Sequence, residues 1–541
     1  MTQASRLGVF LCQCNGRVSG GLPLDQVRRF LEQKQPGLPV IIADNLCQAS
    51  VLSGLIREHK ISPAVLGGCS QLKSKPGFWE EPEVCSLDPD SIGIVDLVRE
   101  TAASYKDTEL IERAKLLLWA QVKRQAKFSG VPQKARKLRF ARPQGEISRR
   151  DLFQSLFPRY QVAPYIEALR CVGEKCALCR QSCALNAVIA DDKGVSIDSL
   201  ACNGCGACTA VCPHRAIIYP NCSSDQLEAE LEGLLSGDSD VLQPRIVAVV
   251  CQSSRHSSSD SDINIFKNTP NVLPIEIPCL FMVSPWLMLR AFDLGAQGLA
   301  LIYNREKCQF KFDSEKWQET VQFVQALLDH WGIQQERVSA FEDKNVEQEL
   351  PRFGRRMANL APILLRSSHP AELPVEGMLL PALIRGMGEK LGVASVGVIS
   401  SGAVPFGKLT LDSSQCTGCG LCAADCPTEA LTVLPGSDSY SLILRQESCV
   451  GCGLCIKVCP ERCLKLEKIL DLGKLGYQSE TITEGDFVRC KVCDAPIAPR
   501  AMIDKVRARI TAAGGVTSQL ETCPDCRMRT KPRLSKSGVG V

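Results

Sequence analysis

Several motifs by which nucleotide-dependent enzymes are recognised are missing from this sequence. No Gly-x-Gly-x-x-Gly follows an expected strand and no Walker A sequence occurs, so we expect neither FAD nor NAD to be bound. Histidine is scarce, with 5 residues in 541, and no paired-carboxylate or triad arrangement stands out. No two cysteines are adjacent, so the cysteine-rich motif of disulfide-reducing catalytic proteins is also missing. We therefore assign no catalytic residue.

Long apolar runs and a strong charge are absent as well. The best candidate for a membrane span, residues 274–303, is interrupted by Glu276, Arg290 and Asp293, so we expect no transmembrane segment. The first residues contain no apolar run long enough for a signal peptide, which favours a cytoplasmic location. A net charge of +4 is small for this length and does not indicate nucleic acid as a partner.

Cysteine, in contrast, is abundant, with 30 residues. Secreted disulfide scaffolds are short, whereas this chain is long enough for about three to five domains. We therefore interpret the cysteines as reduced thiolates that hold metal inside the cell.

The cleaner of two cysteine-dense modules spans residues 409–466 and contains two runs of the form Cys-x2-Cys-x2-Cys-x3-Cys-Pro. In two-cluster ferredoxins, three closely spaced cysteines bind one 4Fe–4S cluster and the fourth reaches across to the other cluster. The spacing predicts two ligand sets, which are Cys416, Cys419, Cys422 and Cys459, and Cys449, Cys452, Cys455 and Cys426. Cys463 is interpreted as a structural cysteine outside both sets.

The other module, residues 165–222, is a variant of this pattern. Its first run has four residues between Cys171 and Cys176, and Ala184 stands where proline is usual. The same crossing predicts two further ligand sets, which are Cys171, Cys176, Cys179 and Cys212, and Cys202, Cys205, Cys208 and Cys183. If Cys171 does not reach its site, that site would hold three irons. Cys222 is interpreted as a bystander.

Alternating strand-like and helical stretches predict two parallel-sheet α/β domains, at residues 1–125 and 240–345. Open α/β sheets bind ligands at the carboxyl ends of their strands, so cysteines at those ends are candidate cluster ligands. They are Cys12, Cys14, Cys47 and Cys69 in the first domain, with Cys85 as an alternative, and Cys251, Cys279 and Cys308 in the second. Buried, redox-silent cysteine is the other interpretation of both sets.

The last four cysteines form two Cys-x2-Cys pairs, 29 residues apart, within residues 486–530. Two such pairs make a tetrahedral thiolate site, so Cys490, Cys493, Cys523 and Cys526 are predicted to bind zinc in a small zinc-ribbon-like unit. A single iron is the alternative. Residues 126–164 and 346–408 are interpreted as a basic linker and a helical linker. The expected fold class is therefore multidomain, α/β and α+β.

The segments GVFLCQCNG at residues 8–16 and LGGCS at residues 66–70 resemble the N-terminal domain of HdrA, the flavin-binding component of heterodisulfide reductase. The resemblance covers residues 6–125. The HdrA family continues into a large flavin-binding domain and this chain does not, so the resemblance implies no flavin chemistry here.

A second resemblance, over residues 245–345, is to the delta subunit of methyl-viologen-reducing hydrogenase. It rests on VVC at 249–251, IPC at 277–279, AFDLGAQG at 291–298, CQF at 308–310 and GIQQERV at 332–338. The resemblance implies a 2Fe–2S cluster in this region and electron transfer from a hydrogenase or formate dehydrogenase to heterodisulfide reductase. Ser253, Ser254 and Asn304 stand near positions where that family has further cysteines, so the sequence departs from the pattern.

Together these features predict an iron–sulfur electron-transfer protein with four 4Fe–4S clusters, zinc and an additional Fe–S cluster in an α/β domain. It would pass single electrons between oxidoreductases of a heterodisulfide-reductase-like complex in an anaerobe. The expected partners are a flavoprotein or heterodisulfide-reductase-like subunits, and a hydrogenase or formate dehydrogenase. Two alternatives stay open. One is a self-sufficient disulfide or quinone reductase that uses cysteines of the α/β domains, and the other is a regulatory or nucleic-acid-binding module.

Overall fold

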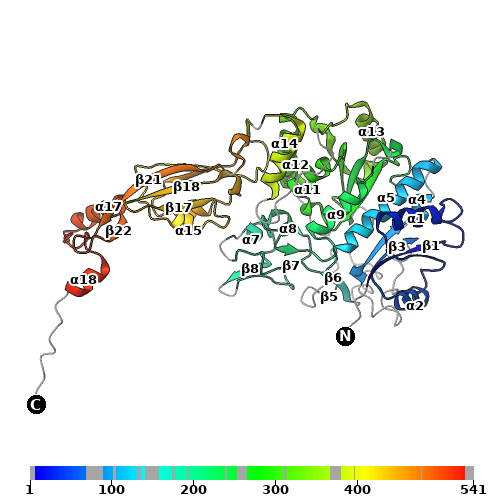
Figure 1. Ribbon diagram of the computed structural model, residues 1–541, viewed down its shortest axis with the longest axis horizontal. Helices are drawn as coiled ribbons and strands as arrows, with labels where there is room; N and C mark the ends of the chain where they lie inside the picture. The colour runs from blue at the N-terminus through cyan, green and yellow to red at the C-terminus, as the bar shows by residue number, and fades with distance from the viewer. Residues whose placement is uncertain are drawn as a thin grey trace, which may run out of the picture. The chain divides into compact units, whose positions relative to one another are not determined.

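The computed structural model divides into two compact units, Met1–Ala394 and Ser395–Val541 (Figure 1). The residues that it describes are 6–68, 89–101, 105–130, 136–140, 158–173, 176, 178–191, 194–237, 240–252, 265–306, 308, 310, 314–365, 379–394, 396–476 and 478–530. Within these residues no helix combines the length and the apolar character needed to cross a membrane.

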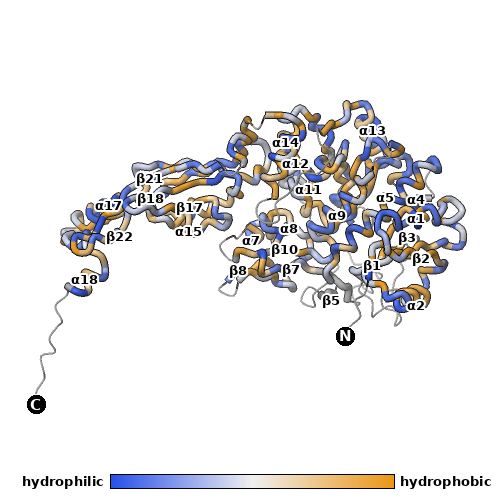
Figure 2. The backbone as a smooth tube through the Cα atoms, in the orientation of Figure 1, coloured by the Kyte–Doolittle hydropathy of each residue, from blue (hydrophilic) through white to orange (hydrophobic). Residues whose placement is uncertain are grey.

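The first unit begins with a parallel sheet in the strand order β2-β1-β3-β4. The strands are β1 Arg6–Cys12, β2 Val40–Ala43, β3 Ile61–Gly68 and β4 Ile92–Asp96. The helices are α1 Leu24–Lys34, α2 Ala49–His59, α4 Leu97–Thr101 and α5 Asp107–Ala126, with a 3-10 turn η2 at Pro89–Ser91. Figure 2 shows β1 and β2 as strongly hydrophobic, and Phe10 and Leu66 are buried in the core that α2 covers. This confirms the parallel sheet expected from the sequence.

Helix α5 connects this sheet to the rest of the first unit (Figure 1). It packs against β3 and β4 and also against α9, Ser224–Leu234. Its buried Arg113 pairs with Glu100 and donates to the carbonyl of Pro270 at 2.9 Å, and its buried Arg124 pairs with Glu230 at 2.6 Å. Because a buried charge is costly unless it is paired, these contacts fix α5 to α4, to the residues before β12 and to α9.

The middle of the chain forms a second parallel sheet, in the order β12-β11-β13-β14, as expected. Its strands are β11 Ile246–Cys251, β12 Val272–Ile277, β13 Gly298–Tyr303 and β14 Val338–Glu342. Between them lie α11 Pro285–Asp293 and α12 Ser314–His330, with 3-10 turns η5 Leu280–Met282 and η6 Gln335–Arg337. The turn η4 Asp240–Leu242 precedes β11, and η7 Asp343–Asn345 follows β14. The hydroxyl of Ser284 caps α11 by accepting from the backbone N–H of Leu287 at 3.3 Å.

The stretch interpreted as a helical linker, residues 346–408, differs from that expectation. Helix α13, Val346–Asn359, buries Leu350, Phe353 and Met357 in the core of the middle sheet. Helix α14, Leu379–Leu391, packs against α11, where Lys390 pairs with Asp293. Apolar side chains repeated at helical spacing need a partner surface, so these helices belong to the domain that covers them.

The first cysteine-dense module is built from short elements. They are β7 Tyr165–Ile166, α7 Leu178–Ser182, β8 Val188–Asp191, β9 Gly194–Ile197, α8 Ala207–Val211 and β10 Ile217–Ile218. β7 pairs with β10 and β8 with β9, all antiparallel. The preceding stretch, expected as a basic linker, contains the antiparallel pair β5 Arg136–Phe140 and β6 Pro158–Val162.

The second unit holds the other cysteine-dense module and the C-terminal cysteine pairs. Its strands are β15 Val398–Ile399, β16 Lys408–Leu411, β17 Leu431–Pro435, β18 Ser439–Leu444, β19 Leu464–Glu467, β20 Leu470–Asp471, β21 Glu480–Arg489 and β22 Pro496–Pro499. Its helices are α15 Leu421–Ala424, α16 Leu454–Val458, α17 Arg500–Ala512 and α18 Pro524–Thr530, with 3-10 turns η8 Gln446–Ser448 and η9 Leu472–Lys474. Because β21 pairs with both β18 and β22, the C-terminal cysteine pairs and the module share one sheet.

Candidate metal centres

One site of the second module lies at the start of α15. Cys416, Cys419 and Cys422 line a cavity together with Cys459, which follows α16. The three-cysteine loop turns sharply at Gly418, whose φ is +67° and whose backbone N–H donates to the Cys416 sulfur at 3.4 Å. A side chain at Gly418 would collide with the Tyr440 hydroxyl, because its Cβ would lie 2.2 Å from that oxygen. Tyr440 therefore packs directly over the loop.

The other site of this module gathers around the second run. Burial, together with the neighbouring thiolates of Cys426 and Cys452, raises the pKa of Cys449 to about 11. The pKa of Cys455 rises to about 12 by burial, and its neighbouring thiolates include Cys422 as well as Cys426. Cys426 is also a neighbour of both Cys449 and Cys452, so it lies beside the run that follows it in sequence. Crowded buried thiols ionise together only where a cation offsets their charge, which makes this a site suited to metal.

In the first module, too, the fourth cysteine of each run lies beside thiols of the other run. Burial raises the pKa of Cys179, and the neighbouring thiolates of Cys212 and Cys171 raise it further. Cys171 is thus a neighbour of this thiol despite the wider gap that follows it in the sequence. Burial also raises the pKa of Cys205, whose neighbouring thiolates are Cys202 and Cys183.

The first module contacts the middle α/β domain beside this second group of thiols. Gly206, in the loop between Cys205 and Cys208, lies against η5, so that a Cβ there would come within 2.5 Å of Met282 Cγ. The guanidinium of Arg215 stacks on the ring of Trp286 at 3.8 Å. These contacts exclude any bulky side chain between the cluster-binding loop and η5.

Three cysteines of the middle domain meet at the carboxyl edge of its sheet. Cys251 ends β11, Cys279 follows β12 and Cys308 follows β13, and all three are buried. The Cys279 thiol lies within hydrogen-bonding reach of both others, and these contacts together with burial raise its pKa. Three thiolates supply three of the four ligands that an iron–sulfur cluster needs. The amide of Asn304 donates to Asp343 at 2.7 Å, and Ser253 and Ser254 lie outside the described residues.

The N-terminal sheet places its cysteines in a similar way. Cys12 ends β1 and packs with Cys14 and Cys47 in one hydrophobic cluster. A hydrogen bond with Cys14 lowers the pKa of Cys12 to about 7, against the raising effect of burial. Gly68 leaves room for this pair, since a Cβ there would lie 3.0 Å from that of Cys12. Cys69 and Cys85 lie outside the described residues.

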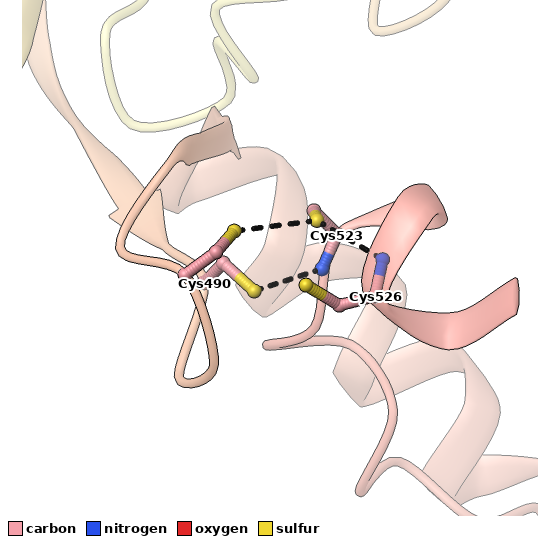
Figure 3. Close-up of side chains that lie close together, drawn as sticks. Cys490, Cys523 and Cys526 are labelled. Atoms are coloured by element: carbon pink, nitrogen blue, oxygen red, sulfur yellow. Dashed lines mark hydrogen bonds between the residues drawn. The ribbon is translucent and has the colours of Figure 1, made fainter. Parts of the chain in front are cut away.

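The C-terminal cysteines lie close together, and Figure 3 shows Cys490, Cys523 and Cys526 side by side. The sulfurs of Cys490, Cys493, Cys523 and Cys526 all lie within 4.8 Å of one another. Cys493 and Cys523 are 3.7 Å apart, close to the roughly 3.8 Å between thiolates that share one tetrahedral zinc. A hydrogen bond from the backbone N–H of Cys523 lowers the pKa of Cys490 to about 6, which favours the thiolate. The group fits a single ion.

Comparison with known proteins assigns three of these regions. Residues 246–360, which we call the delta domain, match the family of the methyl-viologen-reducing hydrogenase delta subunit. Residues 408–466 match the 4Fe–4S dicluster domain, and residues 195–218 match the 4Fe–4S binding domain.

The chain therefore combines a domain of the hydrogenase delta family with 4Fe–4S ferredoxin domains. A stretch of 98 residues is 28% identical to the D-type iron-sulfur component of the F420-non-reducing hydrogenase vhc of Methanococcus voltae, and covers 18% of this chain and 68% of that protein. These matches confirm the resemblances to ferredoxins and to the hydrogenase delta family. The resemblance of residues 6–125 to HdrA stays a prediction.

One thiol beside the ferredoxin sites was not assigned to them from the sequence. Cys463 lines the same cavity as Cys416 and Cys459, and its sulfur is 3.6 Å from that of Cys459. Spacing within the two runs gives no signal for it, because Cys463 follows the last motif. Burial raises its pKa to about 12.

Proposed function

We propose that this chain is the iron–sulfur electron conduit of a complex that joins a hydrogenase or formate dehydrogenase to heterodisulfide-reductase-like subunits. The matches to the ferredoxin and hydrogenase delta families support iron–sulfur electron transfer in this setting. Each cluster accepts one electron at a time, so a chain of clusters relays electrons between enzymes and needs no bond-making site.

The observation that carries the proposal is the crossed grouping of the cysteines. In the second module Cys459 lies with the first run and Cys426 with the second, as the ferredoxin pattern requires. The first module groups Cys212 with Cys171, and Cys183 with Cys205. These groupings support four clusters held by the sixteen cysteines.

The contact at Met282 suggests where electrons enter or leave the first module. Met282 is three residues after Cys279 of the delta domain and touches the Gly206 position between two ferredoxin cysteines. We infer that Cys251, Cys279 and Cys308 hold a cluster that exchanges electrons with the one at Cys202, Cys205, Cys208 and Cys183. Tight packing without intervening side chains shortens the distance that an electron would cross between the two clusters.

Two further sites complete the proposal. The converging thiols Cys12, Cys14 and Cys47 bind an additional cluster, in line with the resemblance of this domain to HdrA. The four sulfurs at the C-terminus bind zinc, because their separation fits one tetrahedral ion and the small unit around them has little core of its own.

The proposal is tested by anaerobic purification of the full chain, followed by metal analysis and EPR of the reduced protein. We expect about sixteen irons from the two ferredoxin modules, more if the α/β-domain thiols also bind clusters, and about one zinc. The reduced chain should transfer electrons to a low-potential dye, yet not oxidise NADH or reduce disulfides by itself. Well-folded protein with half of that iron would contradict the four-cluster assignment, and stoichiometric FAD or rapid NADH oxidation would favour a self-sufficient reductase.

A further inference from the structure

The same short turn follows the fourth cysteine at all four proposed cluster sites, and one copy differs. Each turn has a residue with φ between 49° and 53° three positions after the cysteine, and a buried residue one position later. The φ-positive residues are Asn186, Arg215, Glu429 and Arg462. The buried residues that follow them are Ala187, Ala216, Ala430 and Cys463. Three copies therefore end in alanine and one ends in cysteine.

The turn brings a backbone donor to the cysteine sulfur. The N–H of Ala187 donates to Cys183 Sγ at 3.2 Å, and the N–H of Ala216 donates to Cys212 Sγ at 3.3 Å. The backbone N–H of Cys463 likewise bonds to Cys459. This bond is common to these copies, so it does not distinguish the site at Cys459.

The side chain of Cys463 does distinguish that site. Its sulfur lies 3.6 Å from Cys459 Sγ, and it also reaches Cys416, which belongs to the same group. An alanine methyl group at this position cannot donate a hydrogen bond, whereas a thiol can. Either sulfur of this pair could donate, but a sulfur that binds iron has no proton, so the thiol of Cys463 is the donor.

We propose that the Cys463 thiol donates a hydrogen bond to the cluster-binding sulfur of Cys459 and thereby raises the reduction potential of that cluster alone. The inference rests on the proposed ligation by Cys416, Cys419, Cys422 and Cys459. Reduction adds one electron to the cluster and increases the negative charge on its sulfurs, so a nearby donor stabilises the reduced state more than the oxidised state. The electron comes from the partner protein or from dithionite, and the proton stays on Cys463.

The experiment is an EPR-monitored redox titration of the anaerobically purified full chain and of three variants. Cys463→Ala reproduces the arrangement of the other three sites, and Cys463→Ser keeps an O–H donor. Ala430→Cys is the reciprocal variant, because it places a thiol at the matched position beside Cys426. Iron content and circular dichroism of each variant report on cluster loading and folding.

We expect Cys463→Ala to keep its iron and to lower the midpoint potential of one cluster. A tenfold weaker preference for the reduced state corresponds to about 59 mV for one electron. The midpoint potential in Cys463→Ser should lie closer to that of the parent chain. Ala430→Cys should raise the midpoint potential of a different cluster. If Cys463→Ala does not fold, the other two variants still test whether a donor at this position raises the midpoint potential of the neighbouring cluster.

Two results would overturn the inference, and they differ in what they say about the proposed function. Unchanged midpoint potentials in iron-replete Cys463→Ala and Ala430→Cys would refute the tuning role and leave the cluster assignment intact. Loss of about four irons in Cys463→Ala would identify Cys463 as a ligand and refute the assignment of Cys459 as well. Parent protein without these clusters would instead contradict the proposed function.

Discussion

Residues 165–222 and residues 409–466 each carry eight motif cysteines in two runs, yet their surroundings differ. The first module packs on the delta domain, where Gly206 meets Met282 and Arg215 stacks on Trp286. The second shares a sheet with the C-terminal four-cysteine group and has an extra thiol, Cys463, beside one cluster site. Spacing within a run predicts which cysteines are ligands, whereas the neighbouring elements decide which other groups lie beside them.

The largest expected effect tests whether both modules cross their fourth ligands. Cys426→Ser should remove the cluster of Cys449, Cys452 and Cys455, because Cys426 lies with that run. Cys212→Ser is the matched change in the first module and should remove the cluster of Cys171, Cys176 and Cys179. Metal analysis should show the loss of about four irons in each variant, and the EPR spectrum should show the loss of one cluster signal. Selective loss of the cluster adjacent in sequence would refute the crossing.

Cys171→Ser tests whether Cys171 is a cluster ligand in spite of the wider gap between it and Cys176. Cys171 lies beside Cys179 and Cys212, so Cys171→Ser should remove the same cluster as Cys212→Ser, with loss of about four irons. Iron content and the EPR spectrum are the measurements, and unchanged iron would mean that Cys171 is not a ligand. Cys416→Ser, at the same place in the second module, is the control. A parent chain that already shows the three-iron signal would mean that Cys171 does not ligate.

Cys493→Ser tests whether the C-terminal group is separate from the redox sites that share its sheet. Cys493 is the exposed member of that group, so the change removes one thiolate with little effect on the core. We expect release of about one zinc and unchanged 4Fe–4S signals, because the site is structural. Metal analysis before and after buffer exchange measures this. Loss of cluster signal, or iron in place of zinc, would make these cysteines part of the electron path.

The smallest expected effect concerns the packing of the two cluster loops. Gly206→Ala places a Cβ 2.5 Å from Met282 Cγ and should destabilise the first unit by about 1–3 kcal/mol. Gly420 is the equivalent glycine of the second module, with a similar φ of +73° against +74°, and a Cβ there would meet only Val433 at 3.5 Å. Gly420→Ala therefore carries the same backbone strain without the clash, and thermal unfolding should separate the two variants. Equal shifts would show that the Met282 contact contributes nothing.

The sequence alone predicted the two parallel sheets and the two ferredoxin modules. Strand-length apolar runs and fixed cysteine spacings are local patterns, so they can be recognised without knowing the fold. The sheets are present in the structure, and the family matches confirm ferredoxin domains and the delta domain. The convergence of Cys251, Cys279 and Cys308 also followed from the rule that parallel strands end at a common edge.

Contacts between residues far apart in the sequence were decided only by the tertiary structure. Helix α13 looked like part of a linker because its apolar residues do not reveal which sheet they cover. Cys463 looked like a spare cysteine because no spacing rule links it to Cys416, 47 positions earlier in the chain. Its place beside Cys459 depends on a left-handed turn at Arg462 and on burial against the cavity. Local chemistry thus determined which residues can bind iron, and packing determined which other groups those residues touch.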